Sequence, residues 1–404
     1  MEILEPKELW EVLTNRRKRL AEVENQVASI ISKVREEGEP ALRELTKTYD
    51  GVEIKDFRVS RSEIEEAKDS FLTPERRDFL EKIAGRIGAF AKRELPKNFK
   101  IKEPEGVLER IYVPIEPVGI YIPAGTAPLI STVLMTVVPA RTAGVKRIVV
   151  TTPPDKDGKA NKAVVATCAL FGVKEIYKIG GSQGVAALAY GVGKIPKVAK
   201  IVGPGNEYVV AAKKLLYGTV DIDCPAGPSE VLVFADKRAF LPYLFAELAS
   251  QAEHRNGLAI LITPERKVAE ATRNLSLDGF IVQAGKREAI GLIERIAPEH
   301  LVIMAKDGEK IAAKIKNSGA VFIGDYSPVA LGDYLAGPSH VLPTGGTAAS
   351  FSGLSTLTFL RSFARIRWNK KGLEKWAPAI KKLAELEDLP CHKESVEIRL
   401  KNQN

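Results

Sequence analysis

Residues 147–151 read RIVVT, and three more short apolar segments follow: EIYKI (175–179), AKIV (199–202) and EVLVFA (230–235). Patterns typical of helices separate them, over residues 161–171, 183–190 and 207–216. Short strands that alternate with helices form βαβ units, whose parallel sheet is buried on both faces. We therefore predict an α/β domain built on a parallel sheet in this part of the chain.

A second series of the same kind follows, with four more predicted strands at 258–263, 280–283, 300–305 and 320–324. Helical patterns precede these strands, so the series predicts a second α/β unit. The first hundred residues are mainly helical, since Val23, Val27 and Ile30 recur at the spacing of one helix face. From about residue 355 the chain is predicted to be helical and rich in Lys and Arg, and it ends in a short polar extension.

The composition is that of a globular protein of 404 residues, with 45% apolar and 27% charged residues. At about 100–200 residues per domain, two to four domains are expected. Three cysteines do not make a disulfide framework and fit a reducing compartment. The sequence contains neither a run of about 18 apolar residues nor the features of a signal peptide. We expect a cytoplasmic protein with no membrane partner.

The net charge of +9 has two interpretations. It could indicate a nucleic-acid or membrane surface, or simply a surface rich in Lys. We favour the second, because Lys and Glu alternate along the chain instead of forming a basic block. We therefore predict no nucleic-acid partner. The positive excess also suits an anionic ligand such as a dinucleotide.

Two glycine-containing loops each follow a predicted strand and open a helix, GPGNEY (203–208) and GGSQG (180–184). Such loops can offer backbone N–H groups to a phosphate at a helix N-terminus. A dinucleotide loop needs a third small residue, where Tyr208 stands here. A tight turn between strand and helix explains either loop as well, so both interpretations stay open.

The four histidines, at 254, 300, 340 and 392, are few enough to consider one by one. Gln251 and His254 are three residues apart at the end of a predicted helix, so their side chains share a face. Asp333 lies in a loop beside Gly332, and His392 lies in the tail. Imidazole, carboxylate and amide oxygen are plausible ligands of Zn²⁺ or a similar divalent ion. The spacing matches no local zinc motif, and a hydrogen-bonded histidine is the alternative at each position.

Glu299 and His300 stand side by side just before an apolar strand, where they could act as two bases. A helix-terminal glutamate followed by a structural histidine is the alternative. Cys224 is the one cysteine in a predicted loop within the α/β part and the candidate for a thiolate mechanism. A small buried hydrophobic residue is the more common role of a free cysteine.

Together these segments resemble the histidinol dehydrogenase family. The resemblance runs from about residue 20 to the C-terminus and rests on residues 121–128, 203–206, 223–231, 250–254, 297–301, 317–325 and 332–344. It implies two incomplete Rossmann-like α/β domains with parallel sheets, plus small N- and C-terminal helical or tail pieces. It implies an enzyme that uses two NAD to oxidise L-histidinol to L-histidine through L-histidinaldehyde, the last step of histidine biosynthesis. It also implies one Zn²⁺ per subunit and a homodimer whose C-terminal tails are exchanged.

The resemblance also implies roles for individual residues. The metal ligands are Gln251, His254, Asp333 and His392, the last from the partner chain, and they act as substrate contacts through the metal. Further substrate contacts are Ser229, Glu387 and His300, and Glu299 and His300 form the acid–base pair. The NAD contacts are Tyr121, Gln183 and Asn206. His340 either orients Asp333 or stabilises its loop, and Mn²⁺ or Co²⁺ would fit the ligands as Zn²⁺ does.

Some positions depart from the family's pattern. Ala124 replaces a usual glycine, and Val145 and Phe171 stand where the family often has cysteine. The last two argue against a covalent thiol mechanism. None of the departures falls on a predicted ligand or base.

We predict five pieces along the chain. These are an N-terminal helical piece (1–20), a first α/β domain with the metal and catalytic residues (21–119 and 237–354), a second on the NAD side (120–236), a helical piece (355–382) and a tail that reaches the partner subunit (383–404). Three alternatives to this function remain: a related dehydrogenase of another amino alcohol, a nucleotide-binding protein without activity, and a thiol-dependent aldehyde dehydrogenase.

Overall fold

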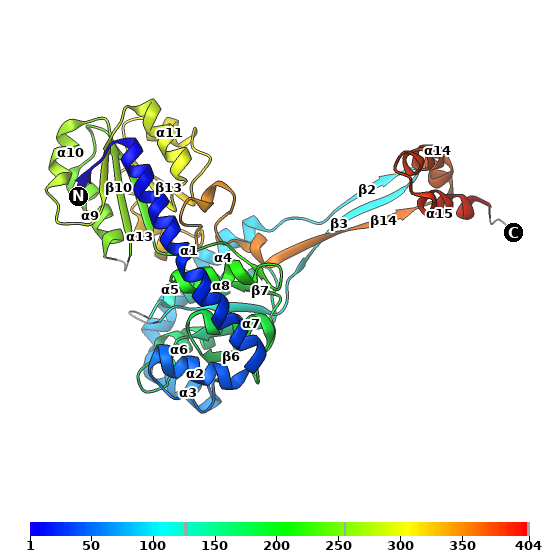
Figure 1. The fold of residues 1–404 in the computed structure, drawn as a ribbon, viewed down its shortest axis with the longest axis horizontal. Coiled ribbons are helices and arrows are strands. Elements are labelled where there is room, and N and C mark those ends of the chain that lie inside the picture. The colour runs from blue at the N-terminus through cyan, green and yellow to red at the C-terminus, as the bar shows by residue number, and fades with distance from the viewer. Residues whose placement is uncertain (125–127, 254–255, 402–404) are drawn as a thin grey trace. The chain divides into compact units, whose positions relative to one another are not determined.

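The structure is a computed structural model that describes residues 1–124, 128–253 and 256–401. It consists of two compact units (Figure 1). The first contains Met1–Leu95 and Ile115–Phe359, and the second contains Pro96–Pro114 and Leu360–Asn404. Within the described residues we find no helix that is both long and apolar enough to cross a membrane.

The first unit contains two parallel sheets, of which sheet A has six strands in the order β1-β11-β10-β9-β12-β13. Their bounds are β1 Glu2–Ile3, β9 Glu230–Ala235, β10 Leu258–Thr263, β11 Phe280–Gln283, β12 His300–Met304 and β13 Ala320–Ile323. The helices that follow strands of this sheet are α9 Leu241–Ala252, α10 Arg266–Arg273, α11 Lys286–Ile296, α12 Gly308–Ala312 and α13 Val329–Tyr334. Apart from the added edge strand β1, the order is 3-2-1-4-5, as in a Rossmann fold that lacks its last strand.

Sheet B has five parallel strands in the order β6-β5-β4-β7-β8, which is again 3-2-1-4-5. Its strands are β4 Val118–Tyr121, β5 Ile148–Thr152, β6 Glu175–Lys178, β7 Lys200–Val202 and β8 Asp221–Ile222. Its helices are α5 Ile130–Thr142, α6 Lys162–Leu170, α7 Gly181–Tyr190 and α8 Glu207–Leu216. The prediction of two incomplete Rossmann-like domains is confirmed.

The N-terminal helices are α1 Pro6–Glu37, α2 Glu39–Asp50, α3 Arg61–Phe71 and α4 Pro74–Glu94. Helix α1 has 32 residues and runs along both sheets (Figure 1). Its early residues Leu9 and Leu13 pack in the core of sheet A, whereas Val27 and Val34 pack in the core of sheet B. A single helix therefore joins the two halves of the first unit.

The structure corrects two of the predicted domain boundaries. Helices α2, α3 and α4 pack with α7, α6 and α5, and therefore belong with sheet B and not with residues 237–354. Strand β9, which we placed in the segment 120–236, pairs with β10 and β12 in sheet A. An apolar stripe shows that a helix or strand is buried, but it does not show which of two sheets it packs on.

The second unit is an antiparallel sheet, sheet C, followed by two helices. Sheet C has the order β14-β3-β2, with β2 Phe99–Glu103, β3 Gly106–Pro114 and β14 Leu360–Trp368, and α14 Lys370–Leu386 and α15 Pro390–Lys401 follow. The predicted helical piece at 355–382 is therefore wrong over β14, and most of the predicted tail at 383–404 is helix. Phe363 and Arg365 lie on the same side of β14, because side chains on a strand repeat with a period of two. The strand is stabilised by pairing with β3, about 250 positions earlier in the chain.

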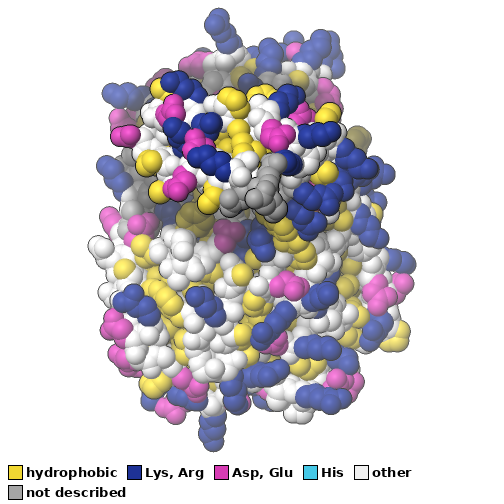
Figure 2. Space-filling model, turned by 90° about the vertical axis from the view of Figure 1, so that its right-hand side faces the viewer, with side chains coloured by type: hydrophobic (Ala, Val, Ile, Leu, Met, Phe, Trp, Pro, Cys, Tyr) yellow, Lys and Arg dark blue, Asp and Glu magenta, His cyan; other side chains and the backbone are white. Residues whose placement is uncertain are grey.

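The surface is charged but mixed in sign. On the face drawn in Figure 2, Lys and Arg side chains are spread widely, with Asp and Glu side chains between them.

Candidate active site

Glu299 and His300 lie at the amino end of β12, in the interior of the first unit. Their exposed fractions are 5% and 3%. The apolar residues Leu301 to Met304 anchor the strand between β9 and β13, which fixes the position of both side chains. The pair therefore has little rotational freedom and is largely removed from solvent.

The backbone of Glu230, the first residue of the adjacent strand β9, holds both side chains. Its N–H donates to Glu299 Oε2 at 2.7 Å, and its carbonyl oxygen lies 3.0 Å from His300 Nδ1. Because a carbonyl oxygen can only accept, Nδ1 carries the hydrogen, and a neutral His300 then has its lone pair on Nε2. Nε2 lies 3.7 Å from Asp333 Oδ1, so the basic nitrogen points toward this carboxylate.

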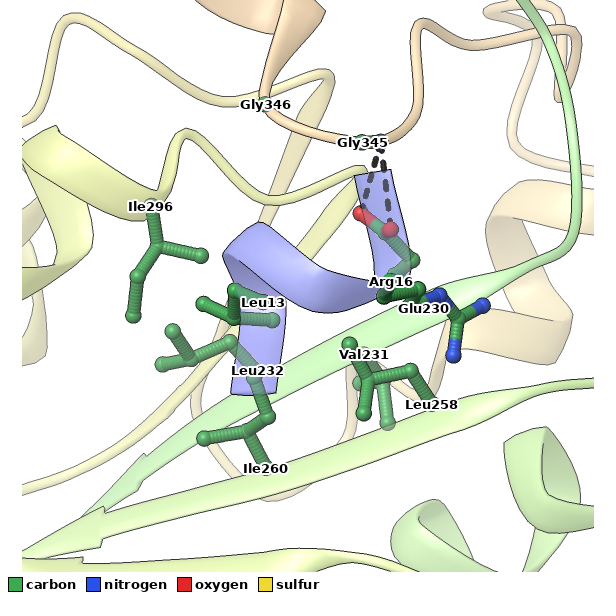
Figure 3. Close-up of a pocket in the computed structure, with 10 residues that line it drawn as sticks. All are labelled: Leu13, Arg16, Glu230, Val231, Leu232, Leu258, Ile260, Ile296, Gly345 and Gly346. Carbon is green, nitrogen blue, oxygen red and sulfur yellow. Dashed lines mark hydrogen bonds between the residues drawn. The ribbon is translucent and has the colours of Figure 1, made fainter. Parts of the chain in front are cut away.

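The side chain of Glu230 anchors this backbone in turn. Both carboxylate oxygens accept a hydrogen bond from the N–H of Gly345, at 3.1 Å each (Figure 3). The residue also lines a small pocket beside Leu13 and Arg16 of α1. Glu230 has no role among the predicted site residues, although a glutamate at the start of an otherwise apolar strand is a signal in the sequence.

Burial raises the pKa of Glu299 well above the ordinary value of a glutamate. The nearby charges of Glu230 and Asp333 raise it further, while the hydrogen bond from the Glu230 N–H and the charge of Arg16 lower it. A carboxyl group with a raised pKa exchanges its proton nearer to neutral pH, as a general acid or base requires.

Asp333 lies on the short helix α13, with a quarter of its side chain exposed. Burial, followed by the charge of Glu247, raises its pKa to about 6. Glu247 is itself buried on α9, and its Oε2 accepts a hydrogen bond from the N–H of Val329 at 3.0 Å. This bond ties the first residue of α13 to α9 and so positions Asp333.

Gln251 follows Glu247 by one turn of α9 and has an exposed fraction of 2%. Its Oε1 is buried and has no hydrogen-bond partner in the described part of the chain. A buried carbonyl oxygen without a partner is costly, and a metal ion would satisfy it. The buried face of α9 consists of Leu244, Glu247, Leu248 and Gln251. Two polar residues on the apolar face of a helix are a signal of a functional site that the sequence contains.

The other two predicted ligands are His254 and His392. His254 falls outside the described residues, and His392 lies exposed on α15 of the second unit, where Glu387 is also exposed at the end of α14. Within the described residues there is no group of three or more His, Cys, Asp or Glu side chains that could hold a metal. Of the predicted set, only Gln251 and Asp333 lie in the described part of the first unit. The amide and carboxylate oxygens of these two fit a divalent ion.

Ser229 immediately precedes β9 and is half buried. Its carbonyl oxygen accepts a hydrogen bond from the N–H of Leu258 at 3.0 Å. The residue therefore lies next to Glu230, the residue that holds the Glu299–His300 pair, as a substrate contact would require.

The three predicted NAD contacts all lie on the carboxyl side of sheet B. Tyr121 ends β4, Gln183 lies in the first turn of α7 after β6, and Asn206 is the N-cap of α8 after β7. Strands β4 and β7 are neighbours at the point where the strand order reverses. Dinucleotides bind in the crevice at this point in Rossmann folds.

Hydrogen bonds hold the side chains of Tyr121 and Asn206, and that of Gln183 lies close to Gly181. The Tyr121 hydroxyl accepts from the N–H of Gly181 at 3.2 Å, and burial raises the pKa of the phenol to about 12, so it stays protonated. Gly181 has a φ of +59°, and a Cβ there would lie 2.6 Å from Gln183 Oε1. Asn206 Oδ1 caps α8 by accepting from the N–H groups of Tyr208 and Val209 at 3.2 Å each. The amide nitrogen of Asn206 thus remains to donate outward.

His340 connects Asp333 to α5. Its Nδ1 lies 2.9 Å from the carbonyl oxygen of Asp333, and its Nε2 lies 3.2 Å from Thr132 Oγ1. Burial lowers the pKa of His340 to about 4, so the ring is neutral at working pH. Because this contact is to the backbone of Asp333, it fits both of our expectations, a histidine that orients Asp333 and one that stabilises its loop.

Cys224 is fully buried, and burial, followed by the charge of Asp223, raises the pKa of its thiol. A reactive cysteine needs the opposite, a thiolate stabilised in an accessible position. The structure therefore gives no support to the thiol-dependent alternative.

Comparison with known proteins gives a consistent result. The family model described as histidinol dehydrogenase matches residues 13–400. The histidinol dehydrogenase of Methanothermobacter thermautotrophicus is 45% identical over 397 residues, with 93% of each chain covered. The crystal structure of histidinol dehydrogenase from Elizabethkingia anophelis superposes with a TM-score of 0.86 at 38% identity, covering 94% of this chain and 92% of that one. A probable aldehyde dehydrogenase from Listeria monocytogenes, with a TM-score of 0.50 and 15% identity over 90% of this chain and 96% of its own, shares the fold alone.

Proposed function

The chain belongs to the histidinol dehydrogenase family, and from this premise we propose that it oxidises L-histidinol to L-histidine through L-histidinaldehyde. When bound, two NAD per substrate would supply the hydride acceptors, and one Zn²⁺ per subunit would orient the substrate. The observation that carries this proposal is the buried Glu299–His300 pair, whose proton positions are set by the backbone of Glu230.

In the first oxidation His300 acts as the base. Its Nδ1–H is held by the Glu230 carbonyl, so the lone pair of a neutral His300 is on Nε2, which takes the proton of the substrate hydroxyl. NAD supplies the hydride acceptor. Loss of a proton and a hydride converts the alcohol to the aldehyde.

In the second oxidation Glu299 activates a water molecule. The aldehyde must add water before a second hydride can leave, and a carboxylate is the base that takes the proton of this water. The raised pKa of Glu299 makes its ionised form a stronger base than an ordinary glutamate. Because Glu299 holds the proton taken from the water, the hydrate is left as its anion, which becomes the acid on losing a hydride; NAD, when bound, would supply the acceptor.

The zinc ligands in this proposal are Gln251, His254, Asp333 and His392 of the partner subunit. The ion would orient the substrate by binding its imidazole and amine. Ser229, His300 and Glu387 contact the substrate directly. The unpaired, buried Oε1 of Gln251 supports this assignment.

Tyr121, Gln183 and Asn206 are the proposed NAD contacts. Their position at the carboxyl ends of β4, β6 and β7 supports this, because the reversal of strand order leaves a crevice there. The sheet B half would thus bind the cofactor, and the catalytic residues Glu299 and His300 would act at the amino end of sheet A.

The second unit supports a homodimer with exchanged tails. In the single chain it exposes many large apolar side chains, and exposed apolar surface of this kind is typical of an interface. The most exposed are Phe99, Ile101, Ile366, Trp368, Trp376, Leu383, Leu386 and Ile398. In this dimer His392 and Glu387 would complete the site of the partner subunit.

Zinc removal tests the proposal as a whole. The purified protein should form NADH from L-histidinol, lose this activity on treatment with a chelator and regain it with Zn²⁺. Because the pKa of Asp333 is raised to about 6, the apparent zinc affinity should fall as the pH drops below this value, where the proton competes with the metal. Full activity in a protein shown to be free of metal would contradict the proposal.

Mixed dimers test the exchange of tails. His300→Asn and His392→Asn chains, each inactive alone, should regain activity when co-expressed. Each heterodimer then has one intact site, so a random mixture should reach about a quarter of the wild-type activity. If His392 serves its own chain, the mixture stays inactive.

A further inference from the structure

Lys213 and Asp223 form an ion pair in the interior of the sheet B half, outside the groups assigned so far. Lys213 lies on α8, and Asp223 follows β8. The exposed fractions of their side chains are 0% and 1%. Lys213 Nζ contacts Asp223 Oδ1 directly.

The pair holds both backbone polar groups of one residue, Gly203. Lys213 Nζ donates to the Gly203 carbonyl oxygen at 2.9 Å, and Asp223 Oδ2 accepts from the Gly203 N–H at 2.8 Å. Gly203 has a φ of +119°, and a Cβ there would collide with the carbonyl oxygen of Tyr121. Gly203 is therefore fixed by the ion pair and packs against the end of β4.

Gly203 begins the turn that carries Asn206. The same turn is held a second time, since the N–H of Gly205 donates to the carbonyl oxygen of Ala226 at 3.1 Å. Ala226 lies three residues after Asp223 in the segment that leads to Ser229 and β9. Asp223 thus contacts the turn directly and begins the segment that supports it.

Burial of an ion pair costs free energy. Two charges lose their hydration on burial, and apolar residues of similar volume often give equal or greater stability. What apolar residues do not give is the pair of hydrogen bonds to Gly203. We therefore attribute the presence of two charged residues here to the hydrogen bonds by which they hold this turn.

We propose that Lys213 and Asp223 are positioning residues for the dinucleotide. They hold the turn 203–206 in the geometry in which Asn206 and Tyr121 contact NAD, before the cofactor arrives. The inference rests on the proposed function, because it takes these two residues to be NAD contacts.

The double variant K213M/D223L tests the inference, since it removes both charges together and leaves no unpaired buried ion. We expect the KM for NAD and the dissociation constant of NADH to rise about tenfold or more. The KM for L-histidinol and the zinc content should stay within about twofold of wild type, which a merely structural defect would not predict. An unchanged NADH affinity in the folded variant would overturn the inference.

The matched control is K200M/D221L. This Lys–Asp pair, with 2.7 Å between Lys200 Nζ and Asp221 Oδ2, joins the first residues of β7 and β8, at the opposite end of sheet B from Gly203. Its removal should leave the affinity for NADH unchanged. An equal loss of NADH affinity in the control would show a general effect of losing a Lys–Asp pair from sheet B and would also overturn the inference.

Hydrogen exchange of the wild-type protein tests the inference without a variant. The Gly203 amide should be protected in the absence of cofactor, because Asp223 accepts its hydrogen. Exchange as fast as in an unfolded peptide would contradict a turn held in advance. If the wild-type protein binds no NADH at all, the proposed function fails; if it does and K213M/D223L binds NADH equally well, the inference alone fails.

Discussion

His300→Asn is expected to lower kcat for the oxidation of L-histidinol by roughly 10²–10⁴-fold. The asparagine amide can still donate to the Glu230 carbonyl, which His300 Nδ1 contacts at 3.0 Å, so the strand end should keep its structure. What is lost is the lone pair of Nε2, the only proposed acceptor of the hydroxyl proton. Zinc content and the dissociation constant of NADH should stay at wild-type values. Steady-state kinetics with each substrate, together with metal analysis, checks this.

The assignment of His300 would be contradicted by a variant that loses zinc and unfolds at lower temperature while its remaining metal-loaded fraction turns over normally. That result would make His300 a structural residue. A variant with normal zinc content and a kcat within a few-fold of wild type would also contradict it.

Glu299→Gln is expected to affect the second oxidation more than the first. The glutamine amide oxygen can keep the hydrogen bond from the Glu230 N–H, now 2.7 Å from Glu299 Oε2, but it cannot take a proton from water. The oxidation of supplied L-histidinaldehyde should fall by roughly 10²–10⁴-fold, and the NADH formed per L-histidinol should fall from two toward one. An aldehyde-trapping reagent should recover the intermediate.

The pH profile gives an independent check of Glu299. The base is the ionised carboxylate, and burial raises the pKa of this group. The rate of aldehyde oxidation should therefore rise with pH through a pKa well above that of an ordinary glutamate, and this limb should be absent in Glu299→Gln. A wild-type profile that is flat from pH 5 to 9 would contradict the role.

The sequence predicted both parallel sheets because buried strands of parallel sheets are continuous apolar segments, such as 148–150 and 258–262. It did not predict which sheet the N-terminal helices cover, since the apolar stripes of α2 and α3 are alike whatever they pack on. It also missed β14, whose partner β3 is distant in the chain and whose residues after Leu360 are all exposed, so that no buried apolar face marks the strand. Both errors concern contacts between distant segments, which local patterns do not contain.

The residues of the candidate site could be predicted from the sequence, whereas the contacts that hold them could not. Glu299 and His300 stand out as two polar residues before an apolar strand, and the structure places them together. Glu230 acts through its backbone, which holds Glu299 and His300. Glu247 acts through its side chain, whose Oε2 lies 3.0 Å from the backbone nitrogen of Val329. Such contacts become visible only when the strands and helices have been placed.

The most direct test of the account is the number of NADH formed, and of L-histidine produced, per L-histidinol consumed by the zinc-loaded protein. We expect two NADH and one L-histidine, because His300 and Glu299 serve successive oxidations in one site. One NADH with release of the aldehyde, or no NADH from a zinc-loaded dimer, would contradict it.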